Sequence, residues 1–287
     1  MNADIRSIEN LRKFGHDAMS ATFEAFIIHA DGLYAEQAAQ AAFEALDRIE
    51  SNLSRFIENS DVSRINSIGK GRPLQIGLST FECLQSGVEM FRQTNGAFDI
   101  AFGSLHRGSN LLKLNEAEHI IELRADGVKI DLGAIGKGYA ADKMRQVLVE
   151  WGITTAFISA GQSTVLAIGK PPGLLGWPIT ISNPADNRVL AKIHLADIAL
   201  SASGLQKGKH IINPRSGRPA NGKSAGWATA KTAAEADALS TAFMVMPLDE
   251  VRSFCAANAD TSAIIIPKDK ERNLLRFGRW DNAEFYR

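Results

Sequence analysis

Residues 129–142, KIDLGAIGKGYAAD, constrain the fold more than any other stretch of the chain. The apolar run at 128–132 predicts a strand, the glycines at 133, 136 and 138 predict a turn, and the following residues predict a helix. The first backbone N–H groups of such a helix can bind an anion, and Lys137 adds a cation in the turn. The glycine spacing matches neither a P-loop nor a dinucleotide-binding loop. The local sequence by itself favours a tight strand-to-helix connection.

The hydrophobic pattern predicts the other elements. Helices are expected over residues 35–53, from Ser79 to Asn95, from the glycine turn to Gly152, and over 233–246 and 249–257. Ser79 and Glu82 have capping-box spacing at the start of the second helix. Strands are expected over 17–30, 120–125, 128–132, 155–160, 164–169, 177–182, 189–193, 198–203, 262–266 and 274–277.

The order of these elements predicts the fold class. Asp126-Gly127 is a two-residue hairpin signal between the strands at 120–125 and 128–132. Residues 54–66 are polar and rich in turn formers, so they predict a surface loop with a short helix, or a substrate lid. Strands mixed with helices, without regular βαβ alternation, indicate a single compact α+β domain over residues 1–287, with mixed or antiparallel sheets and packed helices.

The charge balance excludes some function classes. Lysine plus arginine equals aspartate plus glutamate at 32 each, which argues against a nucleic-acid or membrane-surface role. The two cysteines, Cys83 and Cys255, are far apart, which argues against a disulfide framework or a zinc site. No apolar run reaches the roughly 18 residues of a membrane helix. We therefore expect a cytoplasmic protein, or a periplasmic one if a leader has been removed.

Two further segments carry candidate chemistry. In the predicted helix at 233–246, Asp237, Ser240 and Thr241 lie on one face, and an oxygen-only group of this kind suits Mg²⁺. A solvated acid in the first helical turn is the plainer interpretation of Asp237. His210, in the turn-rich segment HIINPRSGRP, is a candidate general base, although a lone histidine is more often structural or exposed.

Taken together, seven blocks occur in the order typical of one family. They are AMSATFEAF, SRFIENSDVSRIN, GAFD, IDLGAIGKGYAAD, SASG, HIINPRSGRP and EADALSTAFMVM, and the similarity runs from residue 19 to about residue 246. On these blocks the chain resembles the ApbE family of FAD:protein FMN transferases. The resemblance implies a T-fold-like core and Mg²⁺-dependent transfer of FMN from FAD to a threonine or serine of an acceptor flavoprotein, with release of AMP.

The resemblance also implies roles for individual residues. FAD would contact Met19, Phe56, Ala97, Phe98, Asp99, Asp131, Lys137 and Ile211. Mg²⁺ would be bound by the backbone carbonyl of Ala134 and by Asp237, Ser240 and Thr241. His210 would act as the base and Asp237 as a catalytic residue through the metal.

Two other functions are compatible with the same residues. One is an FAD pyrophosphatase, in which water replaces the acceptor hydroxyl and the products are FMN and AMP. The other is a non-catalytic FAD-binding or storage protein. The second is suggested by the segment Gly161-Gln162-Ser163, where the family usually has a Gly-Gly-Asp or Gly-Gly-Asn element.

Overall fold

The computed structural model describes residues 8–102, 108–205, 211–268 and 274–286. Its centre is an eight-stranded sheet in which every neighbouring pair is antiparallel. In spatial order the strands are β1 (Leu11–Ala18), β2 (Ala21–Ile28), β6 (Ala156–Ala160), β7 (Thr164–Ile168), β10 (Ala199–Gly204), β11 (Lys223–Ala230), β12 (Ser262–Pro267) and β13 (Leu275–Phe277).

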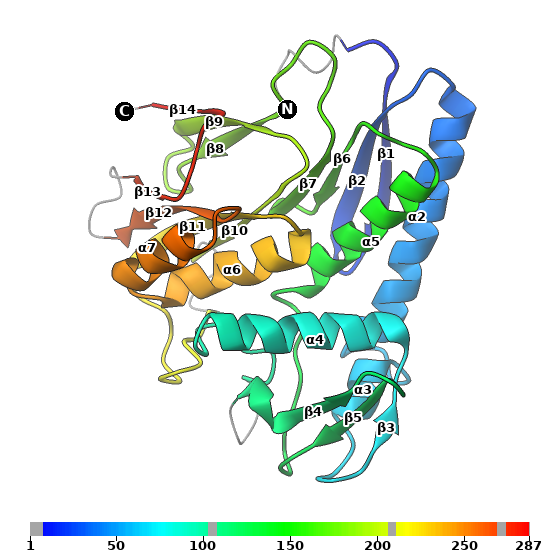
Figure 1. Ribbon diagram of the computed structural model, residues 1–287, viewed down its shortest axis with the longest axis vertical. Helices are drawn as coiled ribbons and strands as arrows, with labels where there is room; N and C mark the ends of the chain where they lie inside the picture. The colour runs from blue at the N-terminus through cyan, green and yellow to red at the C-terminus, as the bar shows by residue number, and fades with distance from the viewer. Residues whose placement is uncertain (1–7, 103–107, 206–210, 269–273, 287) are drawn as a thin grey trace.

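Helices cover one face of this sheet (Figure 1). They are α2 (Gly32–Leu53), α5 (Gly136–Glu150) and α6 (Ala233–Val245), with α7 (Leu248–Ala257) following α6. The other face packs against a three-stranded sheet of β8 (Trp177–Ser182), β9 (Val189–Leu195) and β14 (Ala283–Phe285).

Strand alternation divides the core between the two faces. In β2, Phe23, Ala25 and Ile27 face the helices, whereas Phe26 joins Trp177 in the cluster on the opposite side. Because the sheet is buried on both faces, the ends of its strands and the first turns of the helices packed on it are held rigidly. The candidate site lies at these strand ends and helix starts.

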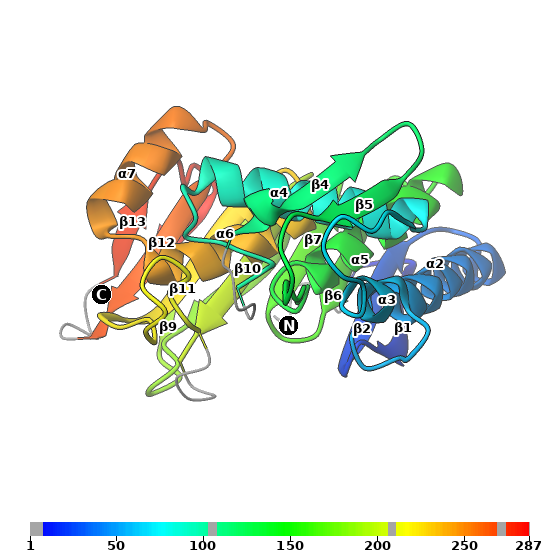
Figure 2. The same ribbon diagram turned by 90° about the horizontal axis from the view of Figure 1, so that it is seen from below.

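A smaller unit extends the helical side of the molecule. Helix α4 (Leu78–Gln93) crosses below α5 and α6 (Figures 1 and 2), and beyond it lie α3 (Asp61–Ile65) and a sheet of β3 (Leu74–Gln75), β5 (Ile120–Leu123) and β4 (Leu112–Asn115). A 3-10 turn, η1 (Ser109–Leu111), precedes β4. Among the described residues, no helix combines the length and apolar character needed to cross a membrane.

The prediction of an α+β fold with packed helices is confirmed, but the strand predicted at 17–30 is wrong in its boundaries. The structure has a hairpin, β1 and β2, that turns at Met19 and Ser20. Both turn residues have positive φ, 53° and 57°. Tight hairpin turns of this kind usually carry Asn or Gly, so Met-Ser gave no turn signal.

The hairpin predicted around Asp126-Gly127 is also wrong. Strand β5 pairs with β3 and β4, and residues 128–132 belong to no sheet. The Asn66 side chain takes the place of a partner strand, since its Oδ1 accepts from the Ile130 N–H at 2.6 Å and its Nδ2 donates to the Ile130 carbonyl at 3.0 Å. A side-chain partner 64 residues away satisfies this backbone, and no local pattern reveals it.

The predicted capping box is wrong as well. Helix α4 begins at Leu78 after Gly77, so Ser79 lies inside the helix. Glu82 instead accepts from the Tyr139 hydroxyl at 2.6 Å and pairs with Lys143 at 2.7 Å. Its carboxylate therefore joins α4 to α5.

Some strands were not predicted: β1, β3, β4, β11 and β14. Strand β11 is central in the large sheet, yet its sequence KSAGWATA consists mostly of small residues with low strand propensity. Its pairing with β10 and β12 on either side, rather than its composition, makes it a strand. The other predicted helices and strands occur within a few residues of their expected bounds.

Candidate functional site

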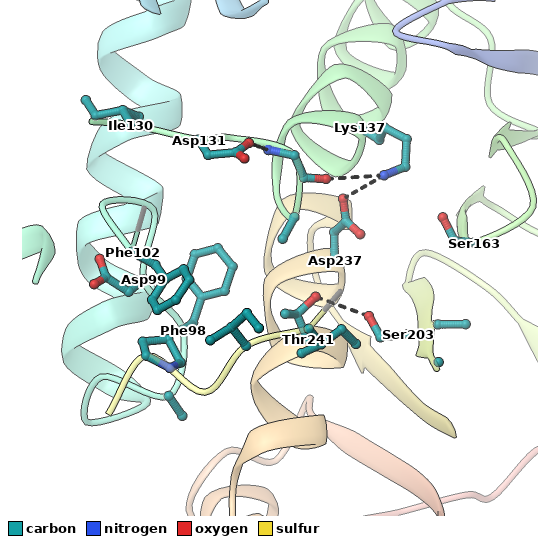
Figure 3. Close-up of a pocket in the computed structure, with 18 of the residues that line it drawn as sticks. Phe98, Asp99, Phe102, Ile130, Asp131, Lys137, Ser163, Ser203, Asp237 and Thr241 are labelled. Atoms are coloured by element: carbon teal, nitrogen blue, oxygen red, sulfur yellow. Dashed lines mark hydrogen bonds and ion pairs between the residues drawn. The ribbon is translucent and has the colours of Figure 1, made fainter. Parts of the chain in front are cut away.

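A cavity of about 1000 Å³ lies where α6, the turn before α5 and the end of β10 meet. Figure 3 shows its labelled residues arriving from separate parts of the chain. Most of the predicted site residues line it: Ala97, Phe98, Asp99, Asp131, Ala134, Lys137, Ile211, Asp237 and Thr241. The structure therefore brings together segments that are spread over residues 97 to 241 of the sequence.

Asp237 is the most enclosed carboxylate of the cavity, with only 4% of the residue exposed. One of its oxygens, Oδ1, accepts from the hydroxyls of Thr164 at 3.3 Å and Ser201 at 3.2 Å. The other, Oδ2, accepts from the Gly138 N–H at 3.2 Å. The plainer interpretation of Asp237 as a solvated helix acid is wrong, because the strands and α5 surround it.

Ser240 and Thr241, the next polar residues of α6, also contact a hydroxyl group of the central sheet. Ser203 on β10 lies 2.8 Å from the Ser240 hydroxyl and 3.1 Å from that of Thr241. Ser240 also donates to the backbone carbonyl of Asp237 at 2.9 Å, and it is fully buried. Thr241 lines the cavity and Ser240 is not among the described residues that do so. The two predicted hydroxyls thus lie together but at different depths.

Lys137 stands at the N-terminus of α5, as its position in the glycine turn predicts. Its Nζ lies 4.0 Å from the Asp237 carboxylate and 3.5 Å from the Gly133 carbonyl (Figure 3). A Cβ on Gly138 would lie 2.1 Å from the Ala233 carbonyl oxygen. The glycine is therefore required for α6 to approach α5 this closely, and this approach places Lys137 beside Asp237.

A second hollow of about 150 Å³ adjoins the first, and both are lined by Arg55, Asp131, Gly133 and Lys137. Met19 and Phe56, both predicted FAD contacts, line this smaller hollow. Met19 keeps its unusual backbone conformation with the help of Glu50, whose carboxylate accepts from the Met19 N–H at 2.8 Å. A non-glycine residue held at positive φ beside a cavity is consistent with a functional constraint.

Arg55 links the two hollows. Its guanidinium pairs with Asp131 at 2.9 Å and lies 4.9 Å from the centre of the Phe56 ring. Phe56 is 84% exposed, so the ring presents a large aromatic surface at the cavity mouth.

The Asp99 carboxylate forms hydrogen bonds with neighbouring parts of the chain. Its carboxylate accepts from the N–H groups of Ala101 at 2.9 Å and Gly108 at 3.0 Å and from the Ser109 hydroxyl at 2.5 Å. These bonds join Asp99 to Gly108 and Ser109 beside the cavity. Phe98 and Ala97 reach the same wall although they are largely buried.

Sequence reasoning did not assign site roles to Thr164, Ser201, Ser203, Gln162 and Ser163. The first three bond to the predicted residues of α6, and the last two line the cavity. The alternation in SASG was a usable signal, since serines two apart on a strand share a face. Predicted His210 lies outside the described residues.

The donor set fits a hard divalent cation. Asp237 and Thr241 supply a carboxylate and a hydroxyl, and Ala134 lies on the same cavity wall. Mg²⁺ is commonly held by one or two carboxylates together with waters and substrate phosphates. In the described part of the chain, no three His, Cys, Asp or Glu side chains gather as a metal site. A metal here would accordingly depend on Asp237 and on neutral oxygens.

Comparisons with known proteins agree with this architecture. The chain is 27% identical to an FAD:protein FMN transferase of Buchnera aphidicola subsp. Schizaphis graminum, with 70% of each chain covered. It is 26% identical to the FAD:protein FMN transferase of Escherichia coli K12, covering 70% of this chain and 68% of that one. The ApbE protein of Thermotoga maritima has the same fold, with a TM-score of 0.82 at 24% identity over 93% of this chain and 97% of that one.

The family assignment follows from a match over most of the chain. The sequence model of the ApbE family matches residues 19–265, which include every candidate site residue described above. The chain belongs to the ApbE family.

Proposed function

We propose that this protein is an FAD:protein FMN transferase, the activity named for its curated relatives. A hydroxyl oxygen of a threonine or serine on an acceptor flavoprotein attacks the FMN phosphorus of FAD. The bond from that phosphorus to the bridging oxygen breaks, AMP leaves with the bridging oxygen, and the hydroxyl proton passes to a base. The product is a phosphodiester that joins FMN to the acceptor.

The observation that carries this proposal is the position of Asp237. A carboxylate with almost no exposure, next to Lys137 and to the N-terminus of α5, faces a cavity large enough for a dinucleotide. The same wall has Thr241 and Ala134 as further oxygen donors. Anionic substrate, cation and helix N-terminus are the usual components of phosphoryl-transfer sites.

Charge balance supports a requirement for a metal. Of the described residues that line the cavity, three are cationic (Arg55, Lys129, Lys137) and three are acidic (Asp99, Asp131, Asp237). Such a lining does not by itself neutralise a diphosphate. Bound Mg²⁺, held by Asp237, Thr241 and the Ala134 carbonyl, would supply the positive charge that stabilises the phosphoryl oxygens.

The residues of the chain divide the remaining tasks. Lys137 orients the diphosphate, and Phe56 with Met19 offers an apolar surface beside it. Thr164 and Ser201 donate to the Asp237 carboxylate, and these two contacts fix its direction. The proton acceptor is assigned to His210 by the family resemblance.

The test is an assay of purified protein with FAD, Mg²⁺ and candidate acceptor flavoproteins from the same organism. Mass spectrometry should find an FMN phosphodiester on a threonine or serine, together with an equal amount of AMP. Asp237→Ala should abolish the transfer, because it removes the only carboxylate among the proposed metal ligands. Asp249→Ala is the control, since Asp249 is exposed on α7 and pairs with Arg252.

The outcomes separate the alternatives. FMN and AMP released at the same rate with and without an acceptor would indicate a pyrophosphatase. FAD that stays bound and intact for hours with Mg²⁺ would indicate a storage protein. Unchanged transfer by the Asp237→Ala variant at limiting Mg²⁺ would refute the metal assignment.

A further inference from the structure

The N-terminus of α6 is held by a side chain from another helix. The two carboxylate oxygens of Asp142, on α5, accept from the backbone N–H groups of Ala233 at 2.7 Å and Ala234 at 2.8 Å. The N-cap residue Thr232 accepts from the Glu235 N–H at 3.2 Å. The first three N–H groups of α6 are thus all bonded, and two of them depend on α5.

Asp142 belongs to the same face of α5 as Gly138, four residues earlier. At Gly138 the two helix backbones touch, since only hydrogen fits against the Ala233 carbonyl. The Gly138 N–H donates to the Asp237 carboxylate. Helices α5 and α6 are consequently joined at two levels, one turn apart, by polar contacts that have defined directions.

This joint lies between the two halves of the proposed site. Lys137 and Ala134 belong to α5 and the turn before it, whereas Asp237 and Thr241 belong to α6. A slide of α6 along α5 would change the 4.0 Å spacing between Lys137 and Asp237 directly. Interactions that fix the position of α6 along α5 therefore also fix the distances between the groups that would bind a metal and a diphosphate.

We propose that Asp142 is a positioning residue that sets how α6 is docked on α5, and thereby places Asp237 and Thr241 opposite Lys137. The role deepens the proposed function and rests on it for the identity of the ligands. Asp142 itself contacts backbone amides of α6 and is not among the described residues that line the cavity.

The free-energy cost of burying the Asp142 carboxylate indicates that it does more than cap a helix. Burial raises the pKa of Asp142 to about 6, against the opposing effect of its two amide hydrogen bonds. An exposed cap such as Asp31, which accepts from Leu33 and Tyr34 at the start of α2, avoids this desolvation. The Asp142 carboxylate, in contrast, lies at the junction of the two site helices, where desolvation of a charged group costs free energy.

The experiment compares Asp142→Ala and Asp142→Asn with Asp31→Ala, a matched control that removes a helix cap from α2. Each variant is titrated with FAD at several Mg²⁺ concentrations, followed by flavin fluorescence, and its thermal unfolding is recorded. Asp142→Ala should weaken FAD binding and raise the Mg²⁺ concentration for half-saturation by about tenfold, as when groups that orient metal ligands are lost. Asp142→Asn keeps one acceptor oxygen and the shape, so its effect should be intermediate.

Asp31→Ala should lower thermal stability while its FAD and Mg²⁺ titrations stay within twofold of wild type. If both Asp142 variants also bind within twofold of wild type, the positioning role is refuted; should Asp142→Ala fail to fold, Asp142→Asn decides. A wild type that binds FAD with Mg²⁺ but transfers no FMN would refute the proposed transferase alone, because the binding comparison still tests Asp142.

Discussion

Gly138→Ala is the substitution whose effect follows most directly from the structure. The added Cβ would lie 2.1 Å from the carbonyl oxygen of Ala233 and 2.8 Å from the Cα of Ala234, both below the 3.0 Å limit for such contacts. The obstacles are backbone atoms, so no side-chain rotation relieves the clash. Helix α6 must move away from α5 by roughly 1 Å, a distance that overpacked cores accommodate only at a cost.

The magnitude combines three effects. Overpacking costs about 1–3 kcal/mol, and a stretched hydrogen bond from the Gly138 N–H to the charged Asp237 adds about 1 kcal/mol or more. Alanine in a helix regains about 1 kcal/mol of propensity. A net loss of about 2 kcal/mol remains, which lowers the Tm of a chain of this size by about 3 °C.

Urea and thermal unfolding followed by circular dichroism measure this loss, and Gly136→Ala is the matched control. A Cβ at Gly136 would meet the flexible end of Met19 at 3.3 Å, so that variant should be close to wild type. Equal unfolding free energies for the two alanine variants would show that the close approach of α5 and α6 does not constrain the fold. FAD affinity should fall with Gly138→Ala, since the shift moves Asp237 away from Lys137.

Two further predictions concern single lysines. Lys137→Ala should weaken FAD binding by about 1–3 kcal/mol through loss of a charge-assisted contact, and an unchanged dissociation constant by calorimetric titration would remove Lys137 from the site. Lys223, which donates to the carbonyls of Phe243 and Met246 at the end of α6, has its pKa lowered to about 8 by burial. Between pH 8 and 10.5 the unfolded chain therefore binds more protons, so the unfolding free energy of wild type should rise with pH relative to Lys223→Met. A difference that stays flat across this range would contradict the burial of Lys223.

Most helices and strands could be predicted, because the sequence of each segment by itself indicated its secondary structure. Helices α2, α6 and α7 and strands β6 to β10 have periodicity or turn residues that identify them locally. Two of the failures have a different cause. Strand β11 and the segment at 128–132 take their conformation from distant partners, a neighbouring strand in one case and the Asn66 amide in the other.

The candidate site divides in the same way. The i, i+3 and i+4 spacing of Asp237, Ser240 and Thr241 already placed three oxygens on one helix face, and the glycine turn already marked the start of α5. Thr164 and Ser201 were beyond such reasoning, because they reach Asp237 only through the register of β7 and β10, in which these two residues are direct partners.

The stretch at 129–142 shows both contributions. The sequence by itself determined a glycine-rich turn into a helix with a lysine at its N-terminus, since backbone freedom and periodicity are local properties. Only the tertiary structure decided that Gly138 lies against the backbone of α6, that Asp142 bonds to its first amides, and that Lys137 lies beside Asp237. These contacts join residues about 90 to 100 positions apart, so they exist only when the packing of two helices on one sheet brings them together.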